Sequence, residues 1–330
     1  MRITIISDSL TELPAAMKAL DGSGHALTFV DGLVPFPEIA ARGLADLAAT
    51  DAIVMGRVMG CDAAALDLVP NARVIALHTS GTDNIDLDAA AARGIAVTNV
   101  KGVNAAQCAE FSIGLMLAVT RQIPAGDAAI RAGKWAAETD SSMDVVGATF
   151  GLVGLGQIGR EAAIRAHAFG MRILCHTRTP DPTLTETLGV TYVPLDRLLA
   201  DADVVSLYAS LTPQTRGMIG RAELARMKPT AYLVNIARGE LVDEAALTDT
   251  LRAGRIAGAA LDVFETEPLT ASPLFDLDNV VLTPHMAGLT RRAKSDAAAL
   301  AVENALAVLD GRPALNPVNR PTGNRKVEDA

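Results

Sequence analysis

A glycine-rich turn between a predicted strand and a predicted helix constrains this chain more than any other feature. Residues 149–159 read TFGLVGLGQIG, and a helical pattern and another apolar run, at 172–175, follow. Glycines at this spacing permit a tight turn, close approach of the backbone to a pyrophosphate, and close packing of helix on strand. The first amides of the helix suit the same anion. The sequence therefore predicts a dinucleotide-binding unit, with a purely structural turn as the alternative. The residues expected to contact the cofactor are Gly154, Gly156, Gln157, Ile158 and Gly159.

The end of the next predicted strand indicates which dinucleotide is bound. NAD-binding proteins carry an acidic residue about 20 positions after the turn, where it accepts hydrogen bonds from the ribose hydroxyls. Here residues 173–178 read ILCHTR, so Thr177 and Arg178 occupy that place. A hydroxyl beside a guanidinium suits a 2′-phosphate. We therefore expect NADP, with NAD as the second candidate and a solvated surface arginine as the alternative for Arg178.

Alternation of short apolar runs with alanine-rich helical patterns predicts the fold class. At roughly 150 residues per domain, the 330 residues suggest two domains. Such alternation is typical of right-handed βαβ units, so we expect an α/β fold with two doubly wound parallel sheets. Long helices are expected at 104–120 and 290–309. Strands are expected at 3–6, 26–30, 52–55, 74–77 and 95–98, then at 149–153, 172–175, 203–207, 231–235, 256–261 and 280–282.

Charge and cysteine content exclude several classes of partner. The 29 basic and 38 acidic residues give a formal net charge of -9, which argues against nucleic acid or an anionic membrane as main partner. The first ten residues do not resemble a signal peptide, and no apolar run reaches the roughly 20 residues of a membrane span. Cys61, Cys108 and Cys175 lack a CxxC spacing, so neither a disulfide framework nor a metal site is expected. We expect a reducing, cytoplasmic location with the cysteines in the core.

Three later segments each end an apolar run with a charged or titratable residue. They read NIARG at 235–239, ALDVFETEP at 260–268 and LTPH at 282–285. The carboxyl ends of strands form the ligand-binding edge of an open α/β sheet. Arg238 can clamp a carboxylate, His285 can move a proton near neutral pH, and Glu267 can orient the imidazole. These three are the predicted catalytic residues. The alternatives are a surface charge, a loop histidine and a solvated acidic loop.

These motifs resemble those of D-isomer-specific 2-hydroxyacid dehydrogenases, and among them the pattern is most similar to NADP-using glyoxylate/hydroxypyruvate reductases. Further motifs in the family's order are HTSGTDNID at 78–86, GIAVTN at 94–99, VNAAQCAEFSIGLMLAVTR at 103–121 and SLTPQTRGMI at 210–219. The resemblance implies a Rossmann-type cofactor domain, 101–287, inserted in a flavodoxin-like substrate-binding domain, 1–100 and 288–330, with substrate in the cleft. It also implies a homodimer formed through the cofactor domain.

The same resemblance implies how substrate is held and reduced. Arg238 would hold the carboxylate and carbonyl of a 2-oxo acid, while His285 would give a proton to the carbonyl oxygen. Glu267 would pair with His285. Backbone N–H groups around Ser80 and Gly81 would cradle the carboxylate.

For the cofactor, the resemblance implies that Asp262 hydrogen-bonds the nicotinamide carboxamide and fixes which ring face gives the hydride. Ser210 and Thr215 would also contact the dinucleotide. Many relatives carry proline where this chain has Ser210, whereas some NADP-using glyoxylate/hydroxypyruvate reductases match it. Ser210 therefore favours NADP, in agreement with Thr177 and Arg178.

Departures from the family's pattern narrow the substrate. Phosphoglycerate dehydrogenases place an arginine of the first domain against the substrate phosphate, but here Gly56 matches that position, with Arg57 beside it as a candidate substrate-binding residue. Ser80 stands where phosphite dehydrogenases carry lysine, so phosphite is not an expected substrate.

Trp135, the only tryptophan, is expected to pack in a core or at a dimer contact.

The expected function is NADPH-dependent reduction of a small 2-oxo acid, such as glyoxylate or hydroxypyruvate, to the D-2-hydroxy acid. One alternative is a dehydrogenase of a larger or phosphorylated 2-hydroxy acid. The other is a dinucleotide-sensing interaction protein, like the corepressors that resemble this family. Expected partners are a small-molecule substrate and a second copy of the chain, with no nucleic acid, membrane or metal.

Overall fold

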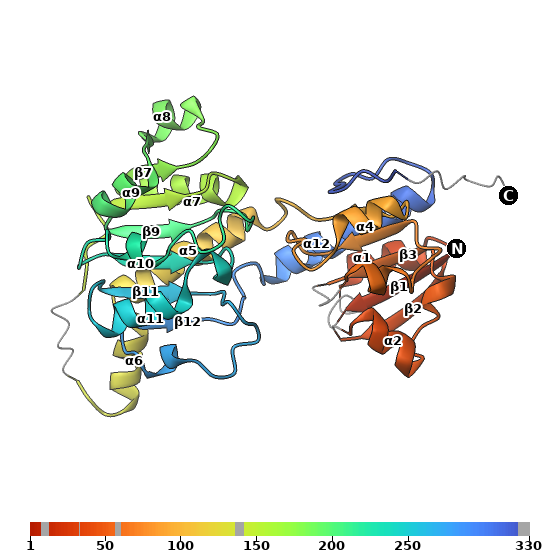
Figure 1. The fold of residues 1–330 in the computed structure, drawn as a ribbon, viewed down its shortest axis with the longest axis horizontal. Coiled ribbons are helices and arrows are strands. Elements are labelled where there is room, and N and C mark those ends of the chain that lie inside the picture. Colours follow the sequence, from red (N-terminus) through yellow and green to blue (C-terminus); the bar gives the residue numbers. More distant parts are fainter. Residues whose placement is uncertain (8–12, 33, 57–60, 136–141, 323–330) are drawn as a thin grey trace. The chain divides into compact units, whose positions relative to one another are not determined.

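The computed structural model describes the whole chain except residues 8–12, 33, 57–60, 136–141 and 323–330. The chain forms two compact units, Met1–Asn104 with Leu289–Ala330, and Ala105–Gly288. Each unit is built on one parallel sheet with helices packed on both faces (Figure 1). The predicted α/β class with two doubly wound sheets is confirmed.

The first unit contains a five-stranded sheet in the order β2-β1-β3-β4-β5. Its helices α1 (Pro14–Asp21) and α12 (Arg291–Leu309) pack on one face. Helices α2 (Phe36–Arg42), α3 (Ala63–Leu66) and α4 (Leu87–Ala92) pack on the other. Because both faces are covered, the central strands are continuous apolar runs instead of alternating ones. The strands are β1 (Arg2–Ser7), β2 (Ala26–Asp31), β3 (Ala52–Met55), β4 (Val74–Leu77) and β5 (Ala96–Thr98).

The second unit contains a seven-stranded sheet in the order β12-β11-β10-β9-β6-β7-β8. Strand β6 (Thr149–Val153) pairs with both β7 (Arg172–His176) and β9 (Val204–Leu207), so the strand order reverses there. In open α/β sheets, ligands bind outside the carboxyl ends of the strands at such a reversal. The other strands are β8 (Thr191–Tyr192), β10 (Tyr232–Asn235), β11 (Gly258–Leu261) and β12 (Val280–Leu282).

Two groups of helices cover the seven-stranded sheet. Helices α5 (Ala105–Thr120), α7 (Gln157–Ala168) and α8 (Pro182–Leu188) contribute to the core on one face. Helices α9 (Leu195–Asp201), α10 (Arg221–Leu224) and α11 (Glu244–Arg252) contribute to the core on the other. Helix α6 (Ile123–Arg131) buries none of its residues.

The sequence predicted most elements, and the exceptions have physical reasons. Strand β8 was missed because two residues show no periodicity. The strand predicted at 256–261 begins only at Gly258. The apolar run is longer than the strand because Ile256 is buried in the turn before it. Trp135 was predicted to pack in a core or at a dimer contact. It is 90% exposed beyond the end of α6, so the core position is wrong and the dimer contact stays a prediction.

The three cysteines are free and buried, as predicted. Burial raises the pKa of Cys61 and of Cys175 to about 12, and that of Cys108 to about 11. The thiolate is the reactive form of cysteine, so these side chains behave as small apolar core residues.

Candidate active site

The glycine turn joins β6 to α7 with a backbone that only glycine permits. Gly154 has a φ of 97°, and a Cβ there would lie 2.6 Å from the backbone nitrogen of Ala209. A Cβ on Gly159 would lie 2.4 Å from the carbonyl oxygen of Gly154. Both distances are far below van der Waals contact, so turn, helix and the segment after β9 pack backbone against backbone.

The start of α7 is open where a phosphate would bind. No heavy atom lies within 4 Å of an ideal Cβ on Gly156, the residue that caps α7. Gly156 offers no side-chain cap to the first amides of the helix, which include those of Gln157 and Ile158. Free space and amide donors at a helix amino terminus fit the pyrophosphate of a dinucleotide.

The residues predicted to select the cofactor lie next to this turn. The N–H of Gly154 donates a 2.9 Å hydrogen bond to the carbonyl of His176, the last residue of β7. Thr177 and Arg178 follow directly, and Arg178 is exposed. The next acidic residue along the chain is Asp181. Its carboxylate already forms an ion pair with Arg160 and accepts a hydrogen bond from the N–H of Thr183 at 3.0 Å.

The Arg160–Asp181 pair keeps that carboxylate ionised. The hydrogen bond from Arg160 is the main cause that lowers the pKa of Asp181. Asp181 also begins α8 as its N-cap residue. This carboxylate therefore serves the local structure beside the predicted cofactor site.

Ser210 and Thr215 lie in one hydrogen-bonded turn after β9. The hydroxyl of Thr215 donates to the carbonyl of Ser210 at 2.7 Å and accepts from the N–H of Thr212 at 2.8 Å. Ala209, which precedes the turn, is the residue that Gly154 approaches. The turn therefore lies beside the glycine-rich turn.

Glu267 and His285 form a close pair at the carboxyl edge of the seven-stranded sheet. Nδ1 of His285 lies 2.8 Å from Oε2 of Glu267, and Oε1 of Glu267 accepts the N–H of Phe264 at 3.1 Å. An ionised carboxylate can only accept hydrogen bonds, so Nδ1 carries a proton in this pair. The pair therefore selects one tautomer and one orientation of the neutral ring.

Strands β10, β11 and β12 lie side by side in the sheet, in that order. Arg238 follows β10, Glu267 lies in the loop after β11, and His285 follows β12. The buried side chain of Asn235 shapes the turn after β10 by donating to the carbonyl of Arg238 at 2.8 Å and accepting the N–H of Ala237 at 3.0 Å. The guanidinium of Arg238 donates to the carbonyl of Ala237 at 2.6 Å. Parallel strands thus bring all three predicted catalytic residues to one edge.

Asp262 is completely buried and holds the turn that carries His285. Its Oδ1 accepts from the Thr283 hydroxyl at 2.6 Å and from the N–H of Met286 at 2.9 Å, and its Oδ2 accepts the N–H of Ala287 at 2.8 Å. Sequence reasoning assigned Asp262 to the cofactor and missed these partners. The available signal was a carboxylate placed directly after a buried strand, since such a group needs several donors.

The predicted substrate-binding residues outside this edge belong to the first unit. Ser80 and Gly81 lie in the loop after β4, where the Ser80 carbonyl accepts from the side chain of Asn99 at 2.8 Å. The Ser80 hydroxyl donates to the carbonyl of Val100 at 3.4 Å. Arg57 lies outside the described residues.

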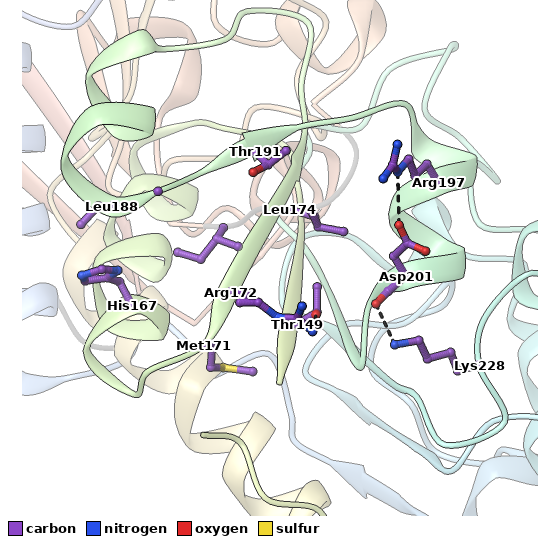
Figure 2. Close-up of a pocket in the computed structure, with 12 residues that line it drawn as sticks. Thr149, His167, Met171, Arg172, Leu174, Leu188, Thr191, Arg197, Asp201 and Lys228 are labelled. Atoms are coloured by element: carbon purple, nitrogen blue, oxygen red, sulfur yellow. Dashed lines mark hydrogen bonds and ion pairs between the residues drawn. The ribbon is translucent and has the colours of Figure 1, made fainter. Parts of the chain in front are cut away.

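A separate cavity of about 700 Å³ lies at the opposite edge of the seven-stranded sheet, where β6, β7 and β8 begin. Figure 2 shows its basic side chains engaged with the protein: Arg197 pairs with Asp201, and Lys228 donates to the Asp201 carbonyl. Arg172 donates to the Thr149 hydroxyl at 2.9 Å. None of the predicted site residues within the described part of the chain lines this cavity.

The described residues contain no group of three or more His, Cys, Asp or Glu side chains that could hold a metal ion. None of the helices they form is both long enough and apolar enough to cross a membrane.

Comparison with known proteins identifies relatives over nearly the whole chain. Residues 113–287 match the model of the D-isomer specific 2-hydroxyacid dehydrogenase NAD binding domain. The chain is 43% identical over 275 residues to glyoxylate reductase of Korarchaeum cryptofilum, covering 82% of this chain and 83% of that protein. It is 39% identical over 317 residues to D-3-phosphoglycerate dehydrogenase of Mycobacterium tuberculosis, covering 96% of this chain but only 58% of that longer protein.

A solved structure agrees with these sequence matches. The crystal structure of an NADPH-dependent glyoxylate/hydroxypyruvate reductase from Sinorhizobium meliloti, in complex with NADP and malonate, is 32% identical and covers 99% of both chains with a TM-score of 0.85. Matches of this extent, with the glycine turn and the titratable residues at the expected strand ends, establish that the chain belongs to the D-isomer-specific 2-hydroxyacid dehydrogenase family.

Proposed function

We propose that this protein is an NADPH-dependent reductase of small 2-oxo acids such as glyoxylate or hydroxypyruvate, with the D-2-hydroxy acid as product. The observation that carries the proposal is the 2.8 Å pair between His285 and Glu267 at the sheet edge that Arg238 and the glycine turn share. An oriented imidazole and a guanidinium at one sheet edge are the groups needed to hold a 2-oxo acid and protonate its carbonyl oxygen.

Each side chain has a distinct task in the proposed reaction. The bound dinucleotide supplies the hydride. Arg238 holds the carboxylate and polarises the carbonyl, and His285 gives its proton to the carbonyl oxygen as charge develops there. Glu267 keeps Nδ1 protonated and stabilises the charged imidazolium before that transfer. On the first unit, the N–H groups around Ser80 and Gly81, together with Arg57, are the proposed substrate contacts.

The proposed cofactor contacts follow from the turn and the strand ends beside it. Gly154, Gly156, Gln157, Ile158 and Gly159 would hold the pyrophosphate. Thr177 and Arg178 would hold the 2′-phosphate of NADP, since the carboxylate nearest along the chain is already paired with Arg160. Further contacts are assigned to Ser210, Thr215 and Asp262. The NADP complex of the Sinorhizobium relative supports this choice of cofactor.

Oxidation of a phosphorylated 2-hydroxy acid is the second candidate, because a mycobacterial relative at 39% identity is named D-3-phosphoglycerate dehydrogenase. Gly56 in place of a phosphate-binding arginine favours the smaller substrates. A dinucleotide-sensing interaction protein would bind the cofactor without turnover.

The experiment is a spectrophotometric assay of NADPH and NADH oxidation with glyoxylate, hydroxypyruvate, pyruvate and a bulky aromatic 2-oxo acid. The reverse direction is assayed with D-3-phosphoglycerate. Preferred use of NADPH with glyoxylate or hydroxypyruvate supports the proposal. Turnover confined to phosphoglycerate supports the second candidate. Cofactor binding without any turnover supports the sensor.

A histidine pair tests the mechanism. Replacing His285 with Ala should lower kcat by about 10²- to 10⁴-fold, the usual contribution of general acid catalysis, and leave the Kd for NADPH unchanged. His167→Ala is the control, because His167 is exposed on α7 at the opposite edge of the same sheet. Equal activity of the two variants would reject His285 as the proton donor.

We also propose a homodimer that forms through the cofactor-binding unit. Helix α6 exposes Ile123 (58%) and Ile130 (56%), and Trp135 lies beyond its end with 90% exposure. A second copy is the expected cover for this apolar surface. Sedimentation equilibrium at twice the chain mass of 34.3 kDa would support the dimer, whereas the mass of one chain would reject it.

A further inference from the structure

Two glutamates away from the His285–Glu267 pair exchange hydrogen bonds with each other's backbone. The N–H of Glu244 donates to Oε1 of Glu265 at 3.2 Å, and the N–H of Glu265 donates to Oε2 of Glu244 at 3.3 Å. We call this reciprocal arrangement the Glu244–Glu265 clasp. It joins the first residue of α11 to the loop between β11 and Glu267.

The clasp does not arise from charge attraction. Burial is the main cause that raises the pKa of Glu244, and the negative charge of Glu265 adds to it, whereas the hydrogen bond from the Glu265 N–H lowers it. Of the described residues that line the cavity of about 400 Å³ beside Glu265, Arg216 is basic, but it lies 3.9 Å from Glu240. Two acidic side chains held together, with no ion pair to a basic side chain among the residues that the structure describes, point to a geometric role.

The clasp provides a hydrogen-bond acceptor for a backbone N–H of α11 that the N-cap residue does not bind. Asp243 is the N-cap residue of α11, and its carboxylate accepts the N–H of Ala246 at 2.9 Å. The N–H of Glu244, at the first helical position, has no partner within the helix. Glu265 supplies that partner, so the loop after β11 is tied to the helix terminus.

A backbone contact next to the clasp connects both loops to the catalytic residues. A Cβ on Gly239 would lie 1.9 Å from the carbonyl carbon of Phe264, so the backbone after Arg238 packs directly on the backbone before Glu265. The N–H of Phe264 in turn donates to Glu267, which holds His285. The clasp and this contact are therefore two attachments between the segment that carries Arg238 and the segment that carries Glu267.

We propose that Glu244 and Glu265 are positioning residues that hold the Glu267 loop against the Arg238 segment, so that Glu267 keeps the His285 ring in its Nδ1–H form. This inference rests on the proposed function for its kinetic consequence. Its structural consequence, the orientation of His285, stands apart from any substrate.

The variants are chosen to separate hydrogen bonding from charge. Glu265→Ala removes the acceptor for the Glu244 amide, whereas Glu265→Gln removes the charge and keeps a carbonyl oxygen that can accept. Glu244→Ala removes the acceptor for the Glu265 N–H. It is the substitute variant if Glu265→Ala does not fold. Asp249→Ala is the matched control, since it removes a carboxylate from the same helix α11 that pairs with exposed Arg221.

Two measurements on the full-length protein test the proposal. Long-range ¹H–¹⁵N NMR of the histidine rings, with His285 assigned through its loss in His285→Asn, reports the tautomer. We expect Glu265→Ala to populate the Nε2–H form and to lower kcat by about 10-fold or more, as small misplacements of catalytic groups do, with an unchanged Kd for NADPH. Glu265→Gln and Asp249→Ala should match the parent protein.

Two results would overturn the proposal. One is an unchanged tautomer in Glu265→Ala and in Glu244→Ala. The other is a Gln variant as impaired as the Ala variant, because the accepting oxygen would then not be what matters. If His285 changes tautomer in Glu265→Ala but no 2-oxo acid is turned over by the parent protein, the proposed function fails and the positioning role stands.

Discussion

The backbone N–H of His285 donates a 2.8 Å hydrogen bond to the backbone carbonyl of Asp262. His285 has a φ of 50°, a left-handed conformation that costs a residue with a side chain of order 1–3 kcal/mol unless its surroundings hold it. Asp262 provides that support, because its carboxylate also binds Thr283 and the amides of Met286 and Ala287. A buried carboxylate thus determines where the predicted proton donor lies.

Asp262→Asn should destabilise the protein and displace His285. The amide NH₂ would face an N–H donor in place of an accepting oxygen, and an unsatisfied buried group costs about 1–3 kcal/mol. We expect the free energy of unfolding in urea to fall by about 2 kcal/mol, with a lower kcat. Asp249→Asn, at an exposed position on α11, should change the free energy of unfolding by less than about 0.5 kcal/mol. Equal stability of the two variants would show that the carboxylate contacts do not hold the turn.

Arg178→Ala should separate NADPH from NADH. If the guanidinium binds the 2′-phosphate, its loss removes charge-assisted hydrogen bonds that only NADPH makes. The KM for NADPH should then rise by about 10-fold or more, as the loss of even one such bond at about 1.5 kcal/mol implies, and the KM for NADH should stay constant. Arg252→Ala, exposed on α11, is the control. Parallel changes for both cofactors would leave Arg178 as a solvated surface residue.

Gly239→Ala should disrupt the contact between the Arg238 segment and Phe264. A Cβ there would overlap the Phe264 backbone, which cannot move without moving Glu267. We expect the free energy of unfolding to fall by about 3 kcal/mol, as for severe overpacking. Gly114→Ala is the matched control, because Gly114 lies exposed in α5 with no atom within 4 Å of its Cβ position. That change should stabilise the helix by about 0.5–1 kcal/mol. A Gly239→Ala protein as stable as the parent would refute the close packing.

Burial of Glu244 should make the protein less stable as the pH rises. The folded-state pKa of Glu244 is raised by burial, which outweighs the hydrogen bond from the Glu265 N–H that lowers it, so between the unfolded value of about 4.3 and the folded value the native state binds more protons than the unfolded state. Stability falls with pH in that window. Glu244→Gln does not titrate, so chemical denaturation across the window should show it gaining stability relative to the parent protein as pH increases.

Asp249→Asn is the control for this pH dependence, because its stability relative to the parent protein should change with pH in the opposite direction. The hydrogen bond from Arg221 lowers the pKa of Asp249, so its contribution is present above about pH 3.9 and is lost as the pH falls through the folded value. The parent protein should therefore gain, slightly, relative to Asp249→Asn as pH increases. A Glu244→Gln difference that is flat or has this same sign would contradict burial and charge repulsion at Glu244.

Local sequence patterns predicted the sheets because their causes are local. Apolar runs with β-branched residues marked the strands, and they matched at 52–55, 74–77, 149–153 and 280–282 without a shift. The two-residue strand β8 was missed, and a core position for Trp135 was wrong, since neither the edge of a sheet nor the absence of a covering element leaves a periodic signal.

The sequence by itself determined the α/β class, the turn at Gly154 and the placement of Arg238, Glu267 and His285 after successive strands, because strand periodicity and glycine spacing act over short stretches of chain. Only the tertiary structure decided that Asp262 binds the His285 turn and that Glu244 and Glu265 clasp each other across 21 positions of sequence. Hydrogen-bond partners of that kind depend on strand order and on the direction in which each loop leaves its strand. Those are properties of the packed sheet, and residue types alone do not contain them.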